Sequence, residues 1–318
     1  MTKVLIFGAR GQLGRALKAN AWPRGWVPTF VHRGQCDLTD FAAIRAVIWG
    51  HKPDLNINAA AYTAVDKAES EPDVAWAVNT LAPAAMAEAA AAIGTALVQV
   101  SSDYVFSGSL GPAWTEDDIT RPLNIYGKTK VACELAIRAA LPRHLIVRTA
   151  WLYDPSAENF VVAMLRQGLS SARVSVVNDQ FGRPTAASNL AWGLIRAAKV
   201  ALAADDHWGT YHLTNEGPAV MRTGFAEAIF KAAAGWYGRI PAIEPISSSN
   251  YPSAALRPAN SVLDTTKAKA ALGVSLPSWE DTLRLSLARP APGLNARPIP
   301  ALPPFARIFS SRWPVYAA

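Results

Sequence analysis

The start of the chain constrains the fold more than any other segment. An apolar run, Val4–Phe7, is followed directly by Gly8, Gly11 and Gly14. A continuously apolar run is typical of a buried parallel strand, and glycines at this spacing predict a tight turn into a helix. Gly8 would permit the turn, Gly11 would let the backbone approach a phosphate, and Gly14 would let the helix pack closely. The alternative is an ordinary strand-to-helix turn.

Apolar runs continue to alternate with helical patterns through the first half of the chain. We expect strands at 3–9, 27–32, 54–60, 96–101 and 144–150, and helices at 11–20, 40–50, 72–93 and 126–140. This alternation predicts βαβ units with right-handed crossovers. The fold class is therefore α/β, with a Rossmann-type, doubly wound parallel sheet.

The second half is less regular. We expect helices at 159–170, 185–204, 223–234 and 278–288, strands at 173–177 and 209–213, and Pro/Ser-rich loops at 241–258. These patterns divide the chain into a dinucleotide-binding domain, 1–150, which regains some segments from 151–220, and a smaller α/β substrate lobe, 151–288. The substrate would bind in the cleft between them. Residues 289–318 are a Pro- and aromatic-rich extension that either docks on its own domain or contacts a partner, a second copy or a membrane surface.

Composition excludes several classes of function. The chain has 318 residues and a net charge of +7, but its basic residues form no run of five or more, so nucleic acid is not an expected partner. An anionic small substrate fits the charge equally well. The two cysteines, Cys36 and Cys133, form no ligand cluster, and we expect no metal site. Reduced thiols, no signal peptide and no apolar stretch of membrane-spanning length together predict a cytoplasmic protein without a membrane span.

Cofactor choice is expected to depend on the end of the second strand. A carboxylate there would bind the ribose hydroxyls of NAD and repel a 2′-phosphate. This chain has Arg33 at that position and Arg10 inside the glycine turn. Guanidinium groups suit a phosphate dianion, so the sequence favours NADPH, with NADH possible. The alternative is that both arginines are merely solvated. Asp37 and Leu38 follow closely enough to meet the adenine.

Three polar side chains predict proton transfer to a carbonyl oxygen. Tyr126 and Lys130 lie four apart, which places them on one face of a helix. The ammonium, together with a positive nicotinamide ring, would lower the pKa of the phenol toward the working range. Ser102 follows a strand and could donate to the same oxygen, with Ser101 as the fallback. Asp103 is expected to order this loop. The alternative is a surface helical pair.

Six blocks of sequence resemble dTDP-4-dehydrorhamnose reductases, which are extended short-chain dehydrogenases/reductases. The blocks keep the family's order and cover roughly 1–288. They are the glycine turn, Asn58–Glu69 (NAAAYTAVDKAE), Ser101–Phe106 (SSDYVF), Tyr126–Lys130 (YGKTK), Arg148–Tyr153 (RTAWLY) and Asp179–Thr185 (DQFGRPT). The resemblance implies that NAD(P)H reduces the 4-keto group of dTDP-4-dehydro-L-rhamnose, giving dTDP-L-rhamnose.

The same resemblance assigns roles to individual residues. Tyr126 would be the proton donor, Lys130 would tune it and hold the ribose, and Ser102 replaces the usual threonine. The cofactor would be lined by Gly11, Gln12, Leu13, Asp37, Leu38, Ala61, Tyr62 and Thr63. The nucleotide sugar would be contacted by Ser102, Asp103, Tyr104 and Trp151, although a tryptophan at a strand end is often part of the core.

One departure bears on assembly. Some members carry a glutamate in the first helix that takes part in a metal-linked dimer, and this chain has Ala16 there. A monomer or weak homodimer is therefore expected. Two other functions stay open: an epimerase or 4-ketoreductase acting on another nucleotide sugar, and a non-catalytic regulatory subunit like that of methionine adenosyltransferase, which resembles this family.

Overall fold

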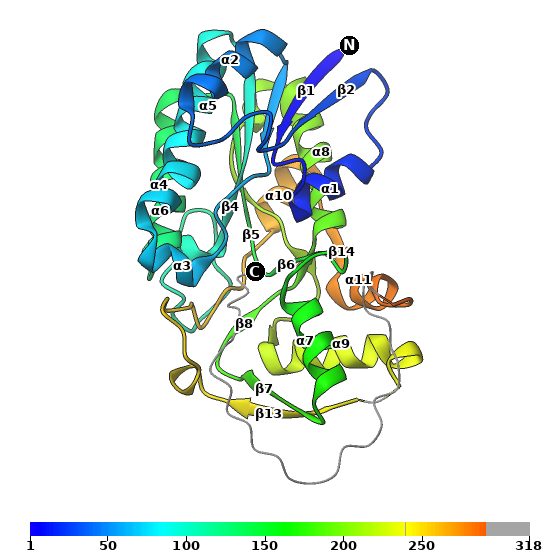
Figure 1. The fold of residues 1–318 in the computed structure, drawn as a ribbon. Helices are drawn as coiled ribbons and strands as arrows, with labels where there is room; N and C mark the ends of the chain where they lie inside the picture. The colour runs from blue at the N-terminus through cyan, green and yellow to red at the C-terminus, as the bar shows by residue number, and fades with distance from the viewer. Residues whose placement is uncertain (239, 291–318) are drawn as a thin grey trace.

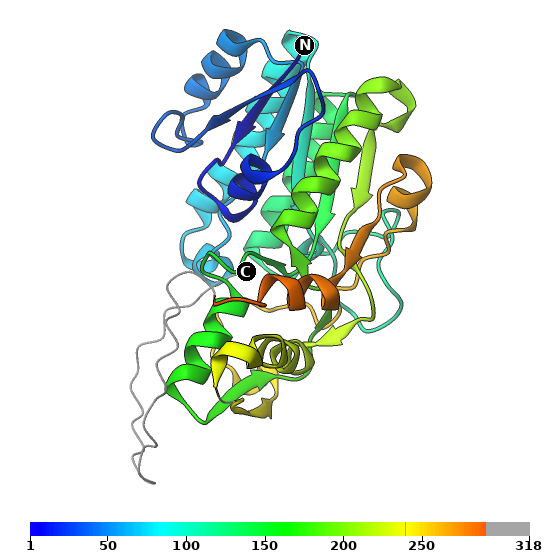
Figure 2. The same ribbon diagram turned by 90° about the vertical axis from the view of Figure 1, so that its right-hand side faces the viewer.

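The computed structural model describes residues 1–238 and 240–290 (Figure 1). Almost all of the predicted extension at 289–318 therefore lies outside the described residues. Figures 1 and 2 show a layered body formed mainly by the first half of the chain, above a smaller body formed by later segments. Within the described part of the chain, no helix is long and apolar enough to cross a lipid bilayer.

The larger body is built on a six-stranded sheet in the order β10-β5-β4-β3-β1-β2. Every neighbouring pair is parallel. The strands are β1 (Thr2–Phe7), β2 (Trp26–Val31), β3 (Leu55–Asn58), β4 (Ala96–Ser102), β5 (His144–Thr149) and β10 (Gly209–His212). The order reverses between β1 and β3, which is where open α/β sheets bind ligands.

Helices cover both faces of the sheet. One face carries α1 (Gln12–Ala19), α8 (Ala187–Ala203) and α10 (Thr266–Leu272), and the other carries α2 (Phe41–His51), α5 (Ala82–Ala92) and α6 (Ile125–Ala140). Val4 and Ile6 pack with the first set, whereas Leu5 and Phe7 pack with the second. Side chains alternate along a strand, so the continuous apolar run fills two cores. The predicted doubly wound α/β fold is confirmed.

Segments after residue 150 return to this sheet. β10 pairs with β5, and α8 packs against α1 and the sheet through Leu190, Ala191 and Leu194. The parallel pairing of β10 with β5 requires a crossover between them, and α8 supplies its helix.

The smaller body has its own core. Its helices are α7 (Phe160–Ser170), α9 (Arg222–Tyr237) and α11 (Trp279–Ser286), and its main ladder pairs β7 (Arg173–Val177) with β13 (Ala242–Ile246). Short pairs join β6 (Leu152–Tyr153) to β9 (Thr185–Ala186), β8 (Phe181–Gly182) to β12 (Val220–Met221), and β11 (Asn215–Glu216) to β14 (Leu276–Ser278). The loop predicted over all of 241–258 is therefore wrong at β13. The prolines of segment 241–258 predict a loop, but the backbone of β13 pairs with β7 and so forms a strand.

The helix predicted at 72–93 is confirmed as a continuous helical run from Pro72 to Ala92, but it is not α-helical throughout. The segment comprises α4 (Pro72–Trp76), one π-helical stretch at Ala77–Leu81, and α5, preceded by the unpredicted α3 (Val65–Ser70). Pro83 lies in the first turn of α5 and has no N–H to donate. The Ala82 N–H bonds back to the Ala77 carbonyl, which is the wider π pattern.

Candidate active site

The carboxyl edge of the sheet opens into a cavity of about 440 Å³. Most of the predicted site residues line this cavity: Gly8, Arg10, Gly11, Gln12, Leu13, Arg33, Ala61, Thr63, Ser102, Asp103, Tyr104, Tyr126, Lys130 and Trp151. It is also lined by His32, Ala59, Ala60, Val100, Thr149, Ala150, Leu152 and Arg222, none of which was assigned, and by the fallback Ser101. The predicted residues Gly14, Asp37, Leu38 and Tyr62 lie outside this lining. Strands far apart in sequence thus bring the glycine turn and the three polar side chains into one cavity.

The glycine turn has the geometry of a phosphate cradle. Gly8 has φ +87, and a Cβ there would be 2.7 Å from the Ala60 nitrogen. Gly14 is closed in, because its Cβ would be 2.0 Å from the Gly8 oxygen. Gly11 is open by comparison and caps α1 without a side-chain hydrogen bond. The first N–H groups of α1 at the cavity wall can therefore bind an anion.

The cationic group at the end of β2 lies beside this turn. Arg10 Nη2 is 3.4 Å from His32 Nε2, and both residues line the cavity with Arg33. Asp37 accepts hydrogen bonds from Thr39 and from Arg33 Nε at 3.3 Å, and these bonds lower the pKa of its carboxyl. Two guanidinium groups fit a phosphate dianion. The Asp37 carboxylate is therefore hydrogen-bonded within its own loop.

The loop after β3 forms another wall. Ala59, Ala61 and Thr63 face the cavity, whereas the Tyr62 hydroxyl donates to Glu71 at 2.6 Å. Burial and the Glu71 carboxylate raise the pKa of Tyr62 to about 12. The buried Asn79 amide holds both the backbone N–H and the carbonyl of Tyr62 and donates to Thr129 Oγ1. A residue of the π-helical stretch therefore ties this loop to α6, and sequence analysis missed it.

Ser102, Tyr126 and Lys130 meet as predicted. Ser102 Oγ donates to Asp103 Oδ1 at 2.8 Å and hydrogen-bonds the Tyr126 phenol, which partly offsets the burial that raises the pKa of Tyr126. Lys130 Nζ donates to the Val100 carbonyl at 2.7 Å, and burial lowers the pKa of Lys130. In this geometry the ammonium is held by β4 rather than by the phenol.

Close packing holds α6, which carries Tyr126 and Lys130, against the Ser102 loop. The Asn124 side chain caps α6 by accepting a hydrogen bond from the Gly127 N–H. A Cβ on Gly127 would be 2.2 Å from the backbone carbonyl oxygen of Tyr104. The rings of Tyr104 and Tyr126 meet edge to face with centroids 5.5 Å apart. Only glycine lets α6 approach this closely, so the glycine of the YGKTK block has a packing role.

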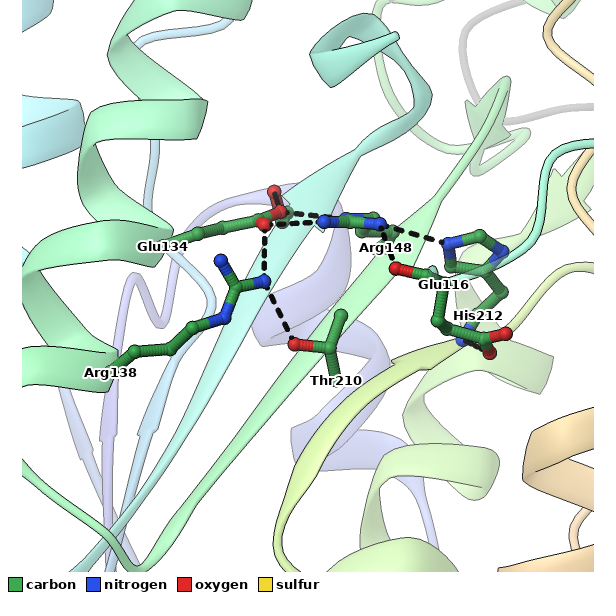
Figure 3. A network of polar contacts seen from close by, with 7 residues as sticks. Glu116, Glu134, Arg138, Arg148, Thr210 and His212 are labelled. Atoms are coloured by element: carbon green, nitrogen blue, oxygen red, sulfur yellow. Dashed lines mark hydrogen bonds and ion pairs between the residues drawn. The ribbon is translucent and has the colours of Figure 1, made fainter. Parts of the chain in front are cut away.

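A buried ionic network supports the same edge (Figure 3). Arg148 forms a two-pronged ion pair with Glu134, at 2.9 Å from Nε and 2.7 Å from Nη2. Ser101 Oγ donates to Glu134 Oε1 at 2.6 Å, and Arg148 Nη1 lies 3.4 Å from His212 Nε2. These residues come from α6, β4, β5 and β10. The network fixes α6 to three strands.

The remaining wall differs in character. Burial raises the pKa of Asp103 to about 6. Trp151 has φ +48, a rare conformation for a tryptophan, and Gly182 makes room for its indole, because a Cβ there would be 2.4 Å from Cε2. The Arg222 guanidinium lies 3.7 Å from the centroid of the Trp151 ring. Arg222 therefore stacks on the ring of Trp151, the residue predicted to contact the sugar.

A second cavity, also about 440 Å³, lies at the opposite edge of the sheet. It is lined by residues at the amino ends of strands and the ends of helices, including Lys52, Gly94 and Arg143. Helix C-termini carry partial negative charge, which these cations offset. Serine, tyrosine and histidine do not occur in its lining, so the catalytic candidates belong to the carboxyl edge.

Comparisons with known proteins agree with this geometry. The RmlD substrate binding domain family matches residues 1–291. The chain is 41% identical over 298 residues to dTDP-4-dehydrorhamnose reductase of Streptomyces griseus, covering 93% of this chain and 96% of that protein. It is 38% identical over 284 residues to the enzyme of that name from Sinorhizobium fredii, covering 89% and 95%.

Solved structures give the same result. A dTDP-4-dehydrorhamnose reductase from Clostridium acetobutylicum has a TM-score of 0.84 at 34% identity, covering 90% of this chain and 98% of that one. The structure from Bacillus anthracis in complex with NADP scores 0.83 at 33% identity, with coverage of 90% and 98%. A UDP-glucose 4-epimerase from Thermotoga maritima scores 0.73 at 18% identity, covers 90% and 97%, and shows the fold alone. The chain belongs to the dTDP-4-dehydrorhamnose reductase family.

Proposed function

We propose that this chain catalyses the NADPH-dependent reduction of the 4-keto group of dTDP-4-dehydro-L-rhamnose, giving dTDP-L-rhamnose. The observation that carries the proposal is the single cavity shared by the glycine turn and by Ser102, Tyr126 and Lys130. The relatives that bear this enzyme's name and the neighbour in complex with NADP support it.

The residues present fit a dinucleotide. The open backbone at Gly11 and the uncapped start of α1 suit a pyrophosphate, and Arg10 and Arg33 suit a 2′-phosphate. Bound NADPH would supply the hydride. Ala61 and Thr63 would line the same groove, and Lys130 would hold the ribose.

The polar side chains would handle the keto oxygen. Ser102 is held beside Tyr126 by its bond to Asp103, so both hydroxyl groups can face one oxygen. The Tyr126 phenol would give its proton to that oxygen as negative charge develops there. The predicted lowering of the Tyr126 pKa by Lys130 is not seen in this structure, where burial raises that pKa, so the positive nicotinamide ring is the group that would favour the phenolate. Asp103, Tyr104 and Trp151 would contact the nucleotide sugar.

We also propose a monomer or weak homodimer located in the cytoplasm. Ala16 packs against the core beneath α1 and offers no carboxylate to a bridging metal. For domain organisation we propose that 1–150, together with α8, β10 and α10, forms the dinucleotide-binding domain, and that the rest of 151–288 forms the substrate lobe.

The test is an NADPH-oxidation assay with freshly made dTDP-4-dehydro-L-rhamnose, run beside UDP- and GDP-linked keto sugars. We expect turnover with the dTDP compound to exceed that with the others. Faster turnover on a UDP or GDP sugar would indicate the alternative reductase or epimerase. A stoichiometric protein partner with no turnover on any substrate would indicate the regulatory subunit.

A further inference from the structure

Arg222 is a buried cation whose guanidinium has no hydrogen-bond acceptor within the part of the chain that the structure describes. It begins α9, is 8% exposed, and lines the cavity beside Asp103, Tyr104 and Trp151. Its guanidinium forms no hydrogen bond or ion pair with any residue in 1–238 and 240–290; only its backbone N–H is bonded, to the Gln180 carbonyl. A guanidinium carries five N–H donors and a permanent charge, so burying it unpaired is costly.

Stacking fixes the orientation of this side chain. The guanidinium carbon lies 3.7 Å from the Trp151 centroid and 5.0 Å from that of Phe160. Trp151 is in turn held by the close approach of Gly182. The aromatic rings occupy the face of the guanidinium, and the donors lie at its edge. The fork is therefore preorganised for a ligand with paired oxygens.

Charges of both signs lie near Arg222. Burial lowers the pKa of Arg222 to about 10 and Arg257 adds to this lowering, whereas Tyr104 and Asp103 oppose it. Arg257 is itself paired with Asp66 at 2.6 Å, and Asp103 is bonded to Ser102. The first turn of the sixteen-residue α9 has no side-chain cap, so its positive end adds to the field. A dianionic group would satisfy the N–H donors of the guanidinium.

We propose that Arg222 binds the diphosphate of the nucleotide-sugar substrate and thereby selects nucleotide-linked sugars over free sugars. This inference rests on the proposed function. The pyrophosphate of the cofactor is a less suitable ligand, because the glycine turn already provides its cradle. The titratable groups that perturb Arg222 are Tyr104, Asp103 and Arg257, and the first two are residues predicted to contact the nucleotide sugar.

Calorimetry with TDP, thymidine and NADPH tests the proposal without requiring turnover. The variant is Arg222→Gln, with Arg222→Lys as the charge-conserving form and Lys231→Gln as a control on the exposed face of α9. We expect Arg222→Gln to weaken TDP binding by about ten- to a hundredfold, the value of a hydrogen bond to a charged group. Thymidine and NADPH should bind as they do to the wild type. The TDP affinity of Arg222→Lys should lie between those of the wild type and Arg222→Gln, and the TDP affinity of Lys231→Gln should match that of the wild type.

Three results would overturn the proposal: unchanged TDP affinity in Arg222→Gln, equal losses for TDP and thymidine, or a loss confined to NADPH. The same two measurements with UDP and uridine separate the contribution of the diphosphate to the affinity from that of the base. The wild type could bind TDP more tightly than thymidine, lose that difference in Arg222→Gln, and still turn over no keto sugar. The proposed function would then fail, and the diphosphate site at Arg222 would stand. If turnover is normal and Arg222→Gln binds TDP normally, only this inference fails.

Discussion

Ser101 Oγ donates a 2.6 Å hydrogen bond to Glu134 Oε1, which lies one helical turn beyond Lys130 on α6. Side chains alternate along β4, so Ser101 turns toward α6 while Ser102 bonds Asp103 beside Tyr126. The neighbouring hydroxyls thus do different things. Ser101 anchors the strand to α6, and Ser102 takes the position at the phenol.

Glu134→Gln is expected to destabilise the protein by about 3–5 kcal/mol, because it leaves the buried Arg148 without its counter-charge. Urea denaturation measures this difference. Glu88→Gln is the matched control: Glu88 also pairs with an arginine, Arg45, at 2.8 Å, but its side chain is 58% exposed. That change should cost less than about 1 kcal/mol. Equal losses in the two variants would contradict the role given to the network.

His212 should make stability depend on pH. Burial, aided by the charge of Arg148, lowers the pKa of His212 from 6.5 to about 3. The unfolded chain takes up this proton as pH falls below 6.5 and the folded chain does not, so folding weakens across that interval. His212→Gln should remove a slope of up to about 1.4 kcal/mol per pH unit, measured by urea denaturation from about pH 7 to about pH 5.

The wild type serves as the reference for this slope. Asp103, with its pKa raised to about 6, stabilises the fold as pH falls and so acts in the opposite direction. Asp103 is present in both the wild type and His212→Gln, so its contribution cancels when the two pH slopes are compared. Identical slopes with and without His212 would show that its ring is not held neutral.

Tyr126→Phe should lower kcat by about a hundred- to ten-thousandfold, the usual contribution of a positioned proton donor. NADPH affinity should change little, because the ring and its edge-to-face contact with Tyr104 are kept. Steady-state kinetics and NADPH titration provide the two readouts. Turnover within tenfold of wild type would remove the phenol from the mechanism.

Gly11→Ala should fold normally and bind NADPH at least about tenfold more weakly, because its Cβ has ordinary contacts within the protein but faces the phosphate position. Fluorescence titration with NADPH measures this loss. Gly50→Ala in α2, where a Cβ meets nothing within 4 Å, is the control and should leave binding unchanged. Normal NADPH affinity in Gly11→Ala would argue against the cradle.

The double variant Arg10→Ala/Arg33→Ala should lower the ratio of kcat/KM for NADPH to that for NADH by about tenfold or more, since charge-assisted bonds to a 2′-phosphate would be lost. Activity with NADH should stay within a few-fold of wild type. An unchanged ratio would show that both arginines are only solvated.

The sequence predicted those parts of the site that depend on neighbours along the chain. The apolar run before Gly8 became β1, and the four-residue spacing put Tyr126 and Lys130 on one face of α6. Other parts were missed. Pro83 has no N–H to donate, so the expected helix contains a π-helical stretch, and β13 forms a strand through its pairing with β7. Hydrophobic periodicity reports neither outcome, although the proline itself is visible in the sequence.

Torsional freedom at glycine, spacing along a helix and runs of apolar side chains are properties of short segments. The sequence alone therefore determined the parallel sheet, the dinucleotide turn and the placement of the phenol and the ammonium on one face of α6. Only the tertiary structure brought Asn79 to Tyr62, Glu134 to Arg148 and Arg222 to Trp151. Each of these contacts joins separate elements, and its energy depends on burial that exists only once the sheet, the helices and the smaller body have packed together.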